Sequence, residues 1–231
     1  MRIPRFSRPR LRTVFLAALA LFVLNIARYA VWPPVGPLAA TNPETTAFIE
    51  YRKDAWESAG HGRTPRRTWR PLKSISPHLA KAVVVSEDST FWSHGGFDFT
   101  GIRDALERNL AKGRFAAGGS TITQQLAKNL YFSPEKSVIR KLQEALVAIR
   151  LELSLPKERI LELYLNCVEW GDGIFGAEAA ARHYFGVSAA NLTRHQAASL
   201  AAMLPSPLKR KPGSPVVRRL ASTIMARMRI E

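Results

Sequence analysis

EDSTFWSHGGFD, residues 87–98, is the segment that the other parts of the chain are expected to serve. It places two adjacent acids, Glu87 and Asp88, near a histidine, aromatic rings and two glycines. Burial beside such rings disfavours the charged form of a carboxyl and raises its pKa, which suits a general base working near neutral pH. A structural interpretation is also open, in which the acids end a helix, His94 fills a pocket as a hydrogen-bonding residue, and the glycines form a turn.

Length, charge and cysteine content limit the class of protein. The 231 residues suffice for one domain with a real core and an appendage. A formal net charge of +16 predicts attraction to polyanions such as nucleic acid, anionic lipid or phosphorylated substrates. The single cysteine, Cys167, excludes an intramolecular disulfide and is expected to be a small buried hydrophobic residue. The sequence contains no metal-spaced His/Cys set, phosphate-loop signature or internal repeat.

The N-terminus predicts a membrane anchor. An arginine-rich tail, residues 1–12, precedes a largely apolar run over residues 13–32, and a spanning helix needs ~20 mostly apolar residues. Arg28 lies near one end, where its side chain can reach the interface, and Tyr29 and Trp32 suit an interfacial aromatic belt. Because the tail carries arginines and no acids, it is expected in the cytoplasm, with the remainder of the chain outside the membrane.

A cleaved signal peptide is the alternative to this anchor. The context around Leu38-Ala39-Ala40 is poor in small residues at the outer position, which favours an uncleaved anchor. Residues 33–72 are expected to be a linker and lead-in, because prolines and a basic stretch leave few apolar positions. Residues 73–231 then form the globular domain, which is still basic without the tail.

From residue 76 onward the sequence is typical of helices separated by caps, which predicts a mostly α fold. Ser76 followed by Pro77 begins a helix that ends near Glu87, although the valines at 83–85 would also suit a strand. A further helix is expected after Asp98 or Thr100, and its apolar face consists of Ile102, Ala105, Leu106, Asn109 and Leu110. Later helices are expected after Pro156, over Ala177–Phe185 with Gly186 as its end, after Thr193 with Gln196 as a capping box, and after Ser214.

GGSTITQQLAKN, residues 118–129, is a second candidate site segment. Its glycines permit close backbone approach, and Ser120 is expected to cap a helix whose first N–H groups attract an anion. Gln124, Gln125 and Lys128 offer donors within about one turn, which suits sugar hydroxyls and a phosphate. An ordinary capped amphipathic helix is the alternative. The small-residue loop Gly113–Gly119 is expected to be either a substrate gate or a plain connector.

Lys136, Arg140 and Glu144 are four residues apart and share one stripe of a helix. Two cations and a carboxylate on one stripe could hold a pyrophosphate leaving group, whereas a surface ion pair is the structural alternative. The apolar face of the same helix is expected to consist of Val138, Leu142, Ala145 and Ile149.

Two later segments are expected to be structural. Glu162 and Asn166 lie one helical turn apart and are expected to satisfy backbone groups of a neighbouring segment. The loop EWGDGIFG, residues 169–176, is interpreted as turn chemistry.

Taken together and in order, five motifs resemble the peptidoglycan glycosyltransferase family, which includes the glycosyltransferase domain of class A penicillin-binding proteins. They are EDSTFWSHGGFD (87–98), GGSTITQQLAKN (118–129), RKLQE (140–144), KERILELYLN (157–166) and GIFGAEAAARHYFG (173–186). The short chain with one N-terminal anchor resembles the monofunctional biosynthetic transglycosylase branch. The resemblance implies a mostly helical, two-lobed, lysozyme-like fold and lipid II as substrate, with a periplasmic catalytic domain on the inner membrane.

The resemblance also implies roles for individual residues. Glu87 matches the general base that deprotonates the 4-hydroxyl of the acceptor's N-acetylglucosamine. Glu144 matches the second essential acid, which assists at the leaving group or through a bound divalent cation, Mg²⁺ or Mn²⁺; no cofactor is implied as obligatory. Lys128 matches the residue that meets the pyrophosphate, with Lys136 and Arg140 as further cations. The substrate-lining positions matched are Ser120, Thr121, Gln124 and Gln125.

Two other functions stay open on the sequence. A lytic transglycosylase or muramidase-like enzyme would need one catalytic acid and no pyrophosphate-binding cations, so the basic set disfavours it. A membrane-anchored binder of anionic polymers would need no general base. The expected partners are lipid II, the nascent glycan strand and membrane lipids, with proteins of cell-wall synthesis or division, and no nucleic acid.

Overall fold

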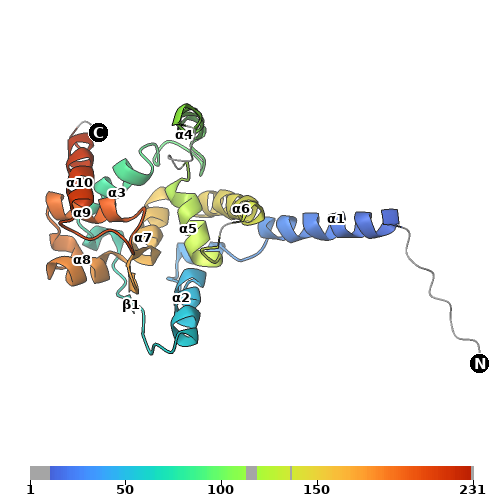
Figure 1. Cartoon of the computed structure of the whole chain (residues 1–231), viewed down its shortest axis with the longest axis horizontal. Coiled ribbons are helices and arrows are strands. Elements are labelled where there is room, and N and C mark those ends of the chain that lie inside the picture. Colours follow the sequence, from blue (N-terminus) through green and yellow to red (C-terminus); the bar gives the residue numbers. More distant parts are fainter. Residues whose placement is uncertain (1–10, 113–118, 136, 230–231) are drawn as a thin grey trace, which may run out of the picture.

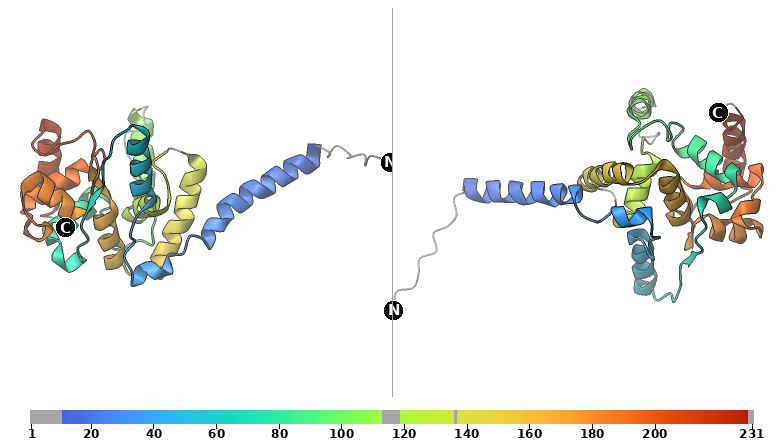
Figure 2. Two further views of the ribbon diagram at one scale, coloured as in Figure 1. Left: turned by 90° about the horizontal axis from the view of Figure 1, so that it is seen from below. Right: turned by 180° about the vertical axis from the view of Figure 1, so that it is seen from behind.

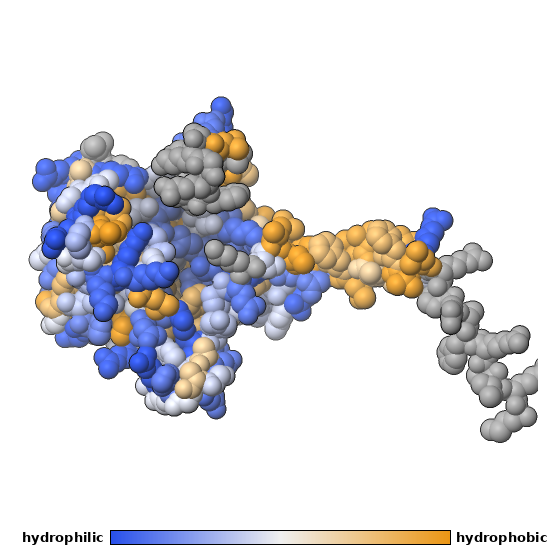
Figure 3. Space-filling model, viewed as in Figure 1, coloured by the Kyte–Doolittle hydropathy of each residue, from blue (hydrophilic) through white to orange (hydrophobic). Residues whose placement is uncertain are grey.

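The computed structural model describes residues 11–112, 119–135 and 137–229, and this part of the chain is mostly helical, as predicted (Figure 1). Helix α1 (Leu11–Ala27) continues into a 3₁₀ turn, Arg28–Ala30, and projects from the rest of the molecule. These 20 residues have a mean hydropathy of 1.8, and none is buried. Their apolar surface is exposed along the whole projection (Figure 3), as expected for a single-pass anchor.

The remaining helices form two groups on either side of one central helix (Figure 2). One group contains α3 (Pro77–Glu87), α9 (Arg194–Met203) and α10 (Pro215–Arg227), which pack on one another, with α8 (Ala177–Phe185) nearby. The other contains α2 (Ala47–Ser58), α5 (Ile122–Tyr131) and α6 (Val138–Ser154). Helix α7 (Lys157–Cys167) contacts α5, α6 and α8 and joins the two groups. Helix α4 (Phe99–Lys112) lies at the edge (Figure 1).

A small sheet completes the group that contains α8. Its strands are β1 (Arg66–Arg67), β2 (Glu169–Gly171) and β3 (Ile174–Phe175), in the order β1-β3-β2. Strand β3 pairs with β1 in parallel and with β2 antiparallel, with a register shift in β2. The loop interpreted as turn chemistry therefore carries two short strands. Three more 3₁₀ turns cover Gly36–Ala39, Leu72–Ser74 and Ala189–Asn191.

Most of the predicted helix ends are confirmed. Thr193 and Gln196 form a capping box at α9, and Ser214 caps α10 through the N–H of Val217. Gly186 ends α8 in the left-handed conformation. Ser76 precedes α3 as expected, but its hydroxyl donates to the carbonyl of Leu192 instead of capping the helix.

Helix α7 holds the segment before α3, as the sequence predicts. The carboxylate of Glu162 accepts from Leu72 N at 2.8 Å. The amide of Asn166 accepts from Arg70 N and donates to Arg70 O, both at 2.8 Å. Cys167 is fully buried, and burial raises its pKa to about 12, in line with the expected hydrophobic role.

Residues 33–72, expected to be a linker and lead-in with no assigned structure, contain α2 and β1. Arg52 of α2 forms an ion pair of 2.8 Å with the buried Glu169, and Trp56 of the same helix is buried in the core. The composition of this segment hid its role because its contacts are with residues more than a hundred positions later in the chain.

The apolar faces predicted for two helices are largely exposed and do not face the core. Helix α6 buries Glu144, Val147, Ala148 and Leu151, whereas the stripe Val138, Leu142 and Ile149 is exposed and Ala145 is only half-buried. In α4, Ala105 is buried but Ile102 and Leu110 are exposed; the side chains of Leu106 and Asn109, and the loop at 113–118, lie outside the described residues.

The physical reason for the exposed stripe of α6 is its place beside the anchor (Figure 1). Gln143 donates to the side-chain oxygen of Asn25 at 2.6 Å, and Arg150 donates to the carbonyls of Tyr29 and Val31. The end of α1 is thus fixed to α6. An apolar face beside a helix that could span a membrane need not be covered by protein, and periodicity alone could not tell it from a core face.

Candidate active site

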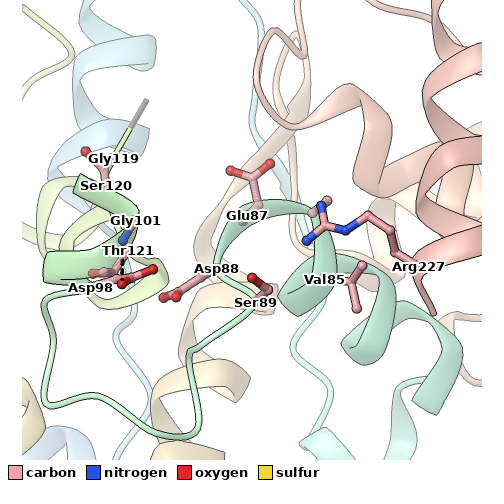
Figure 4. Close-up of a pocket in the computed structure, with 11 residues that line it drawn as sticks. Val85, Glu87, Asp88, Ser89, Asp98, Gly101, Gly119, Ser120, Thr121 and Arg227 are labelled. Atoms are coloured by element: carbon pink, nitrogen blue, oxygen red, sulfur yellow. Dashed lines mark hydrogen bonds between the residues drawn. The ribbon is translucent and has the colours of Figure 1, made fainter. Parts of the chain in front are cut away.

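Glu87 is the last residue of α3, and its half-buried side chain points into a hollow between the two groups of helices (Figure 4). Asp88 and Ser89 line the hollow on the same segment, and Ser120 lies across from them. Arg227 of α10 forms the opposite wall. The hollow is therefore built by segments far apart in the sequence.

The rest of the 87–98 segment is held in place by hydrogen bonds around Asp88. Its carboxylate accepts from the ring of His94 at 2.8 Å and from Ile122 N at 2.9 Å. Gly96 N donates to Nδ1 of His94 at 3.0 Å, so the proton of the neutral ring is on Nε2 and points at Asp88. His94 is a structural hydrogen-bonding residue, which agrees with the structural alternative for that residue.

Glu87 has the electrostatics that the sequence predicts for a base. Burial raises the pKa of its carboxyl above the ordinary value, and the neighbouring Asp88 adds to this. The hydrogen bond from Gln125 Nε2, at 2.9 Å, and the charges of Arg210 and Lys128 act in the opposite direction. The result is a carboxyl that binds a proton more readily than an exposed glutamate.

In the 118–129 segment, some side chains hold the backbone in place and some line the hollow. Thr121, and not Ser120, caps α5: its hydroxyl accepts from Gln124 N, and the side chain of Gln124 accepts from Thr121 N. Both residues are buried, and Thr121 Oγ1 also donates to Gly96 O at 2.7 Å. Ser120 lines the hollow. Of these predicted substrate-lining residues, Ser120 and Thr121 line the hollow, whereas Gln124 does not; Thr121 and Gln124 also fix the backbone through the cap.

Lys128 is within electrostatic reach of both predicted catalytic acids. The charges of Glu87 and Glu144 both act on its ammonium, and those of Arg140 and Lys141 oppose them. Burial is the largest effect and lowers the pKa of Lys128 below its ordinary value. A half-buried lysine with two acids and two more cations nearby is suited to binding an anion with several charges.

Glu144 is almost fully buried and is held by two cations of its own helix. Its Oε1 lies 3.0 Å from Arg140 Nη1, and its Oε2 lies 3.2 Å from Lys141 Nζ. Arg140 also donates to Ser133 O at 2.8 Å. Lys136 lies outside the described residues. Glu144 therefore keeps two cationic side chains at the edge of the site, which orients them for an anionic group.

The donors around Glu144 do not fit a divalent cation. Both of its oxygens face a cationic nitrogen, and the described ranges contain no cluster of three or more His, Cys, Asp or Glu side chains. A divalent cation prefers several oxygen ligands.

Two cations near the predicted acids, Lys141 and Arg210, were not among the predicted site residues. Lys141 lies inside the RKLQE motif and three residues before Glu144, a spacing at which side chains meet on a helix. Arg210 lies in the basic run after α9 and acts on Glu87, and its side chain is fixed by a hydrogen bond to Ala202 O. The spacing between Lys141 and Glu144 could have predicted the first contact. No sequence pattern could have predicted the second, because only the fold brings Arg210 near Glu87.

Comparison with known proteins gives one consistent result. The family model described as Transglycosylase matches residues 55–229, from within α2 to the end of the described chain. The chain is 51% identical over 196 residues, 84% of each protein, to the biosynthetic peptidoglycan transglycosylase of Aromatoleum aromaticum. It is 47% identical over 221 residues to the protein of that name from Alcanivorax borkumensis, covering 95% of this chain and 87% of the relative. A third, from Nitrosospira multiformis, is 52% identical over 166 residues, 72% of each.

Proposed function

Because the chain belongs to the transglycosylase family and is a peptidoglycan glycosyltransferase, we propose that it polymerises lipid II into glycan strands. The acceptor's 4-hydroxyl attacks the anomeric carbon of the growing strand, with inversion and with release of undecaprenyl pyrophosphate. The observation that carries this proposal is the position of the Lys141 ammonium, which lies 3.2 Å from Glu144 Oε2 and donates to Ser120 Oγ in the hollow that Glu87 lines.

Glu87 takes the part of general base. Its carboxyl opens into the hollow and has a raised pKa, which favours removal of a proton from a hydroxyl near neutral pH. Oxygen attacks as the proton leaves, so no free alkoxide forms. Ser120, across the hollow, supplies a hydroxyl for the sugar of the acceptor.

Lys128, Arg140 and Lys141 stabilise the departing pyrophosphate, and Glu144 keeps the last two in position. Cations aimed at the atoms where negative charge develops lower the barrier more than protonation does, because pyrophosphate is already a good leaving group. Lys136 is proposed as a further cation of this set. Gln125 is proposed to bind Glu87, because its side chain donates a hydrogen bond to that carboxylate.

The membrane location follows from the anchor and the apolar stripe of α6. We propose a single span in the inner membrane, with the basic tail in the cytoplasm and the catalytic domain in the periplasm. The exposed side chains Val138, Leu142 and Ile149 lie on the helix to which the end of α1 is fixed. In the proposed orientation, Glu144 and its cations lie near the bilayer surface, as does the pyrophosphate of a lipid-linked substrate.

The test is polymerisation of purified lipid II in detergent by the full-length protein, with gel analysis of glycan strands before and after muramidase treatment. Glu87→Gln and Glu144→Gln are expected to abolish or cripple polymerisation while the protein stays folded. The matched control is Glu107→Gln, which changes an exposed glutamate paired with Arg103 on α4. Near-normal product from Glu87→Gln would reject the assignment, and cleavage of preformed strands without polymerisation would favour a lytic enzyme.

A further inference from the structure

The nitrogen and the oxygen of the Gln125 side-chain amide each form a hydrogen bond. Its Nε2 donates to Glu87 Oε2 at 2.9 Å, and its Oε1 accepts from the hydroxyl of Tyr164 at 2.8 Å. The direction of both bonds is fixed by chemistry. An ionised carboxylate only accepts hydrogen bonds, so the NH₂ group must face Glu87, the carbonyl must face Tyr164, and the phenol must donate.

Tyr164 is placed as a rigid donor. It lies on α7 with no exposed surface, among the largest fully buried side chains of the described chain. A buried hydroxyl without a partner would be costly, and Gln125 is the partner that the structure gives it. Burial also raises the pKa of Tyr164 well above its ordinary value, with Glu87 and Asp88 adding to the effect, so the phenol stays protonated as a donor.

The backbone of Gln125 is fixed as well. It lies in the second turn of α5, and Asn129 Nδ2 donates to its carbonyl at 2.8 Å. What remains free is the rotation of the terminal amide, and a turned amide would point its oxygen at Glu87. The Tyr164 hydroxyl opposes that turn because it would then face an NH₂ group and lose its acceptor.

We propose that Tyr164 is a positioning residue that acts through Gln125 to hold Glu87 in the orientation and proton affinity required for attack by the acceptor hydroxyl. This proposal rests on the proposed function of Glu87 as the base. Tyr164 touches no substrate in it. From the sequence alone, Tyr164 would be expected to be an ordinary core aromatic. Only the fold connects its hydroxyl to the base, through the amide of Gln125.

The proposal predicts the direction of a pH shift. The charged groups acting on Glu87 are Asp88, Arg210 and Lys128, and Arg227 faces it from the wall of the hollow. Tyr164→Phe leaves all four in place. The variant removes the hydroxyl that orients Gln125, so Glu87 loses part of a hydrogen bond that favours its charged form. The pKa of the base then rises, and the acid limb of the activity profile moves to higher pH.

The experiment measures kcat and KM for lipid II across the acid range with the full-length protein, together with thermal unfolding. Tyr164→Phe is expected to fold, to lower kcat about tenfold with little change in KM, and to move the acid limb of the profile to higher pH. The control is Tyr184→Phe, which removes a hydroxyl that donates to the carbonyl of Trp170, away from Glu87. It is expected to leave the acid limb in place.

A double variant distinguishes an effect of Tyr164 that acts through Gln125 from a general packing effect. In a Gln125→Leu background, Tyr164→Phe is expected to add no further shift, because its route to Glu87 is gone. An additive effect, an unshifted acid limb in Tyr164→Phe, or a Tyr164→Phe protein that does not fold would each overturn the positioning role. Failure of the proposed function is distinguishable, because it would appear as an active Glu87→Gln or as wild-type protein that makes no strands.

Discussion

Lys141 Nζ donates a hydrogen bond of 2.8 Å to Ser120 Oγ, and so ties α6 to the residues that precede α5. The same ammonium lies 3.2 Å from Glu144 Oε2. Ser120 also lines the hollow that contains Glu87. Through this one lysine, the cations around Glu144 and the hollow around Glu87 become neighbouring parts of one site.

Lys128→Met is expected to reduce polymerisation by roughly 10²-fold through kcat, because it removes a cation from the developing pyrophosphate charge. Kinetics on lipid II give the size of the effect, and thermal unfolding shows whether the fold is intact. Lys53→Met is the matched control, since Lys53 forms an exposed ion pair with Glu50 on α2. Unchanged kinetics for Lys128→Met would contradict the pyrophosphate role.

The pH profile of polymerisation is expected to be narrower than ordinary glutamate and lysine side chains would give. Burial raises the pKa of Glu87, so the ionised base is lost as pH falls through a value above the ordinary glutamate pKa. Burial lowers the pKa of Lys128, so its charge is lost as pH rises through a value below the ordinary lysine pKa. Measuring kcat/KM across the full range reports both limbs. An acid limb at the pKa of an exposed glutamate contradicts the buried base.

Gly96→Ala is expected to destabilise the protein by about 1–2 kcal/mol, because a side chain is strained at its φ of +95°. An added Cβ would also lie 3.1 Å from Glu152 Cγ. Denaturant unfolding gives the difference in free energy. The neighbouring Gly95 has open space around it, and Gly95→Ala is the control. Equal stabilities for the two variants would show that the Gly96 conformation is not required.

Arg52→Ala is expected to lower the free energy of unfolding by about 3 kcal/mol, because it leaves the carboxylate of Glu169 buried without its charged partner. Lys53→Ala, one residue later, breaks the exposed pair with Glu50 and is expected to cost less than about 1 kcal/mol. Urea unfolding of both variants compares them. Similar losses for the two would indicate that α2 is not an integral part of the domain.

The local features of this chain were predictable because they depend on neighbours within a few residues. Gly186 ends its helix, the capping box at Thr193 forms, and the Glu162/Asn166 pair binds the backbone of another segment, as expected from spacing and residue type. The apolar run at the N-terminus likewise forms an exposed helix of spanning length. In each case the relevant partners or the solvent preference are encoded locally.

The sequence by itself determined the helical class, most helix ends and the segments that carry the chemistry. Only the tertiary structure decided what the side chains of those segments contact: Thr121 and Gln124 form the cap of α5, and Lys141 meets Glu144. It also brought Arg210, from a segment without a predicted role, close enough to act on Glu87. The physical reason is that burial and charge at Glu87 come from helices far apart in the chain. Periodicity describes one helix at a time and holds no information about which neighbour, protein or bilayer, covers each face.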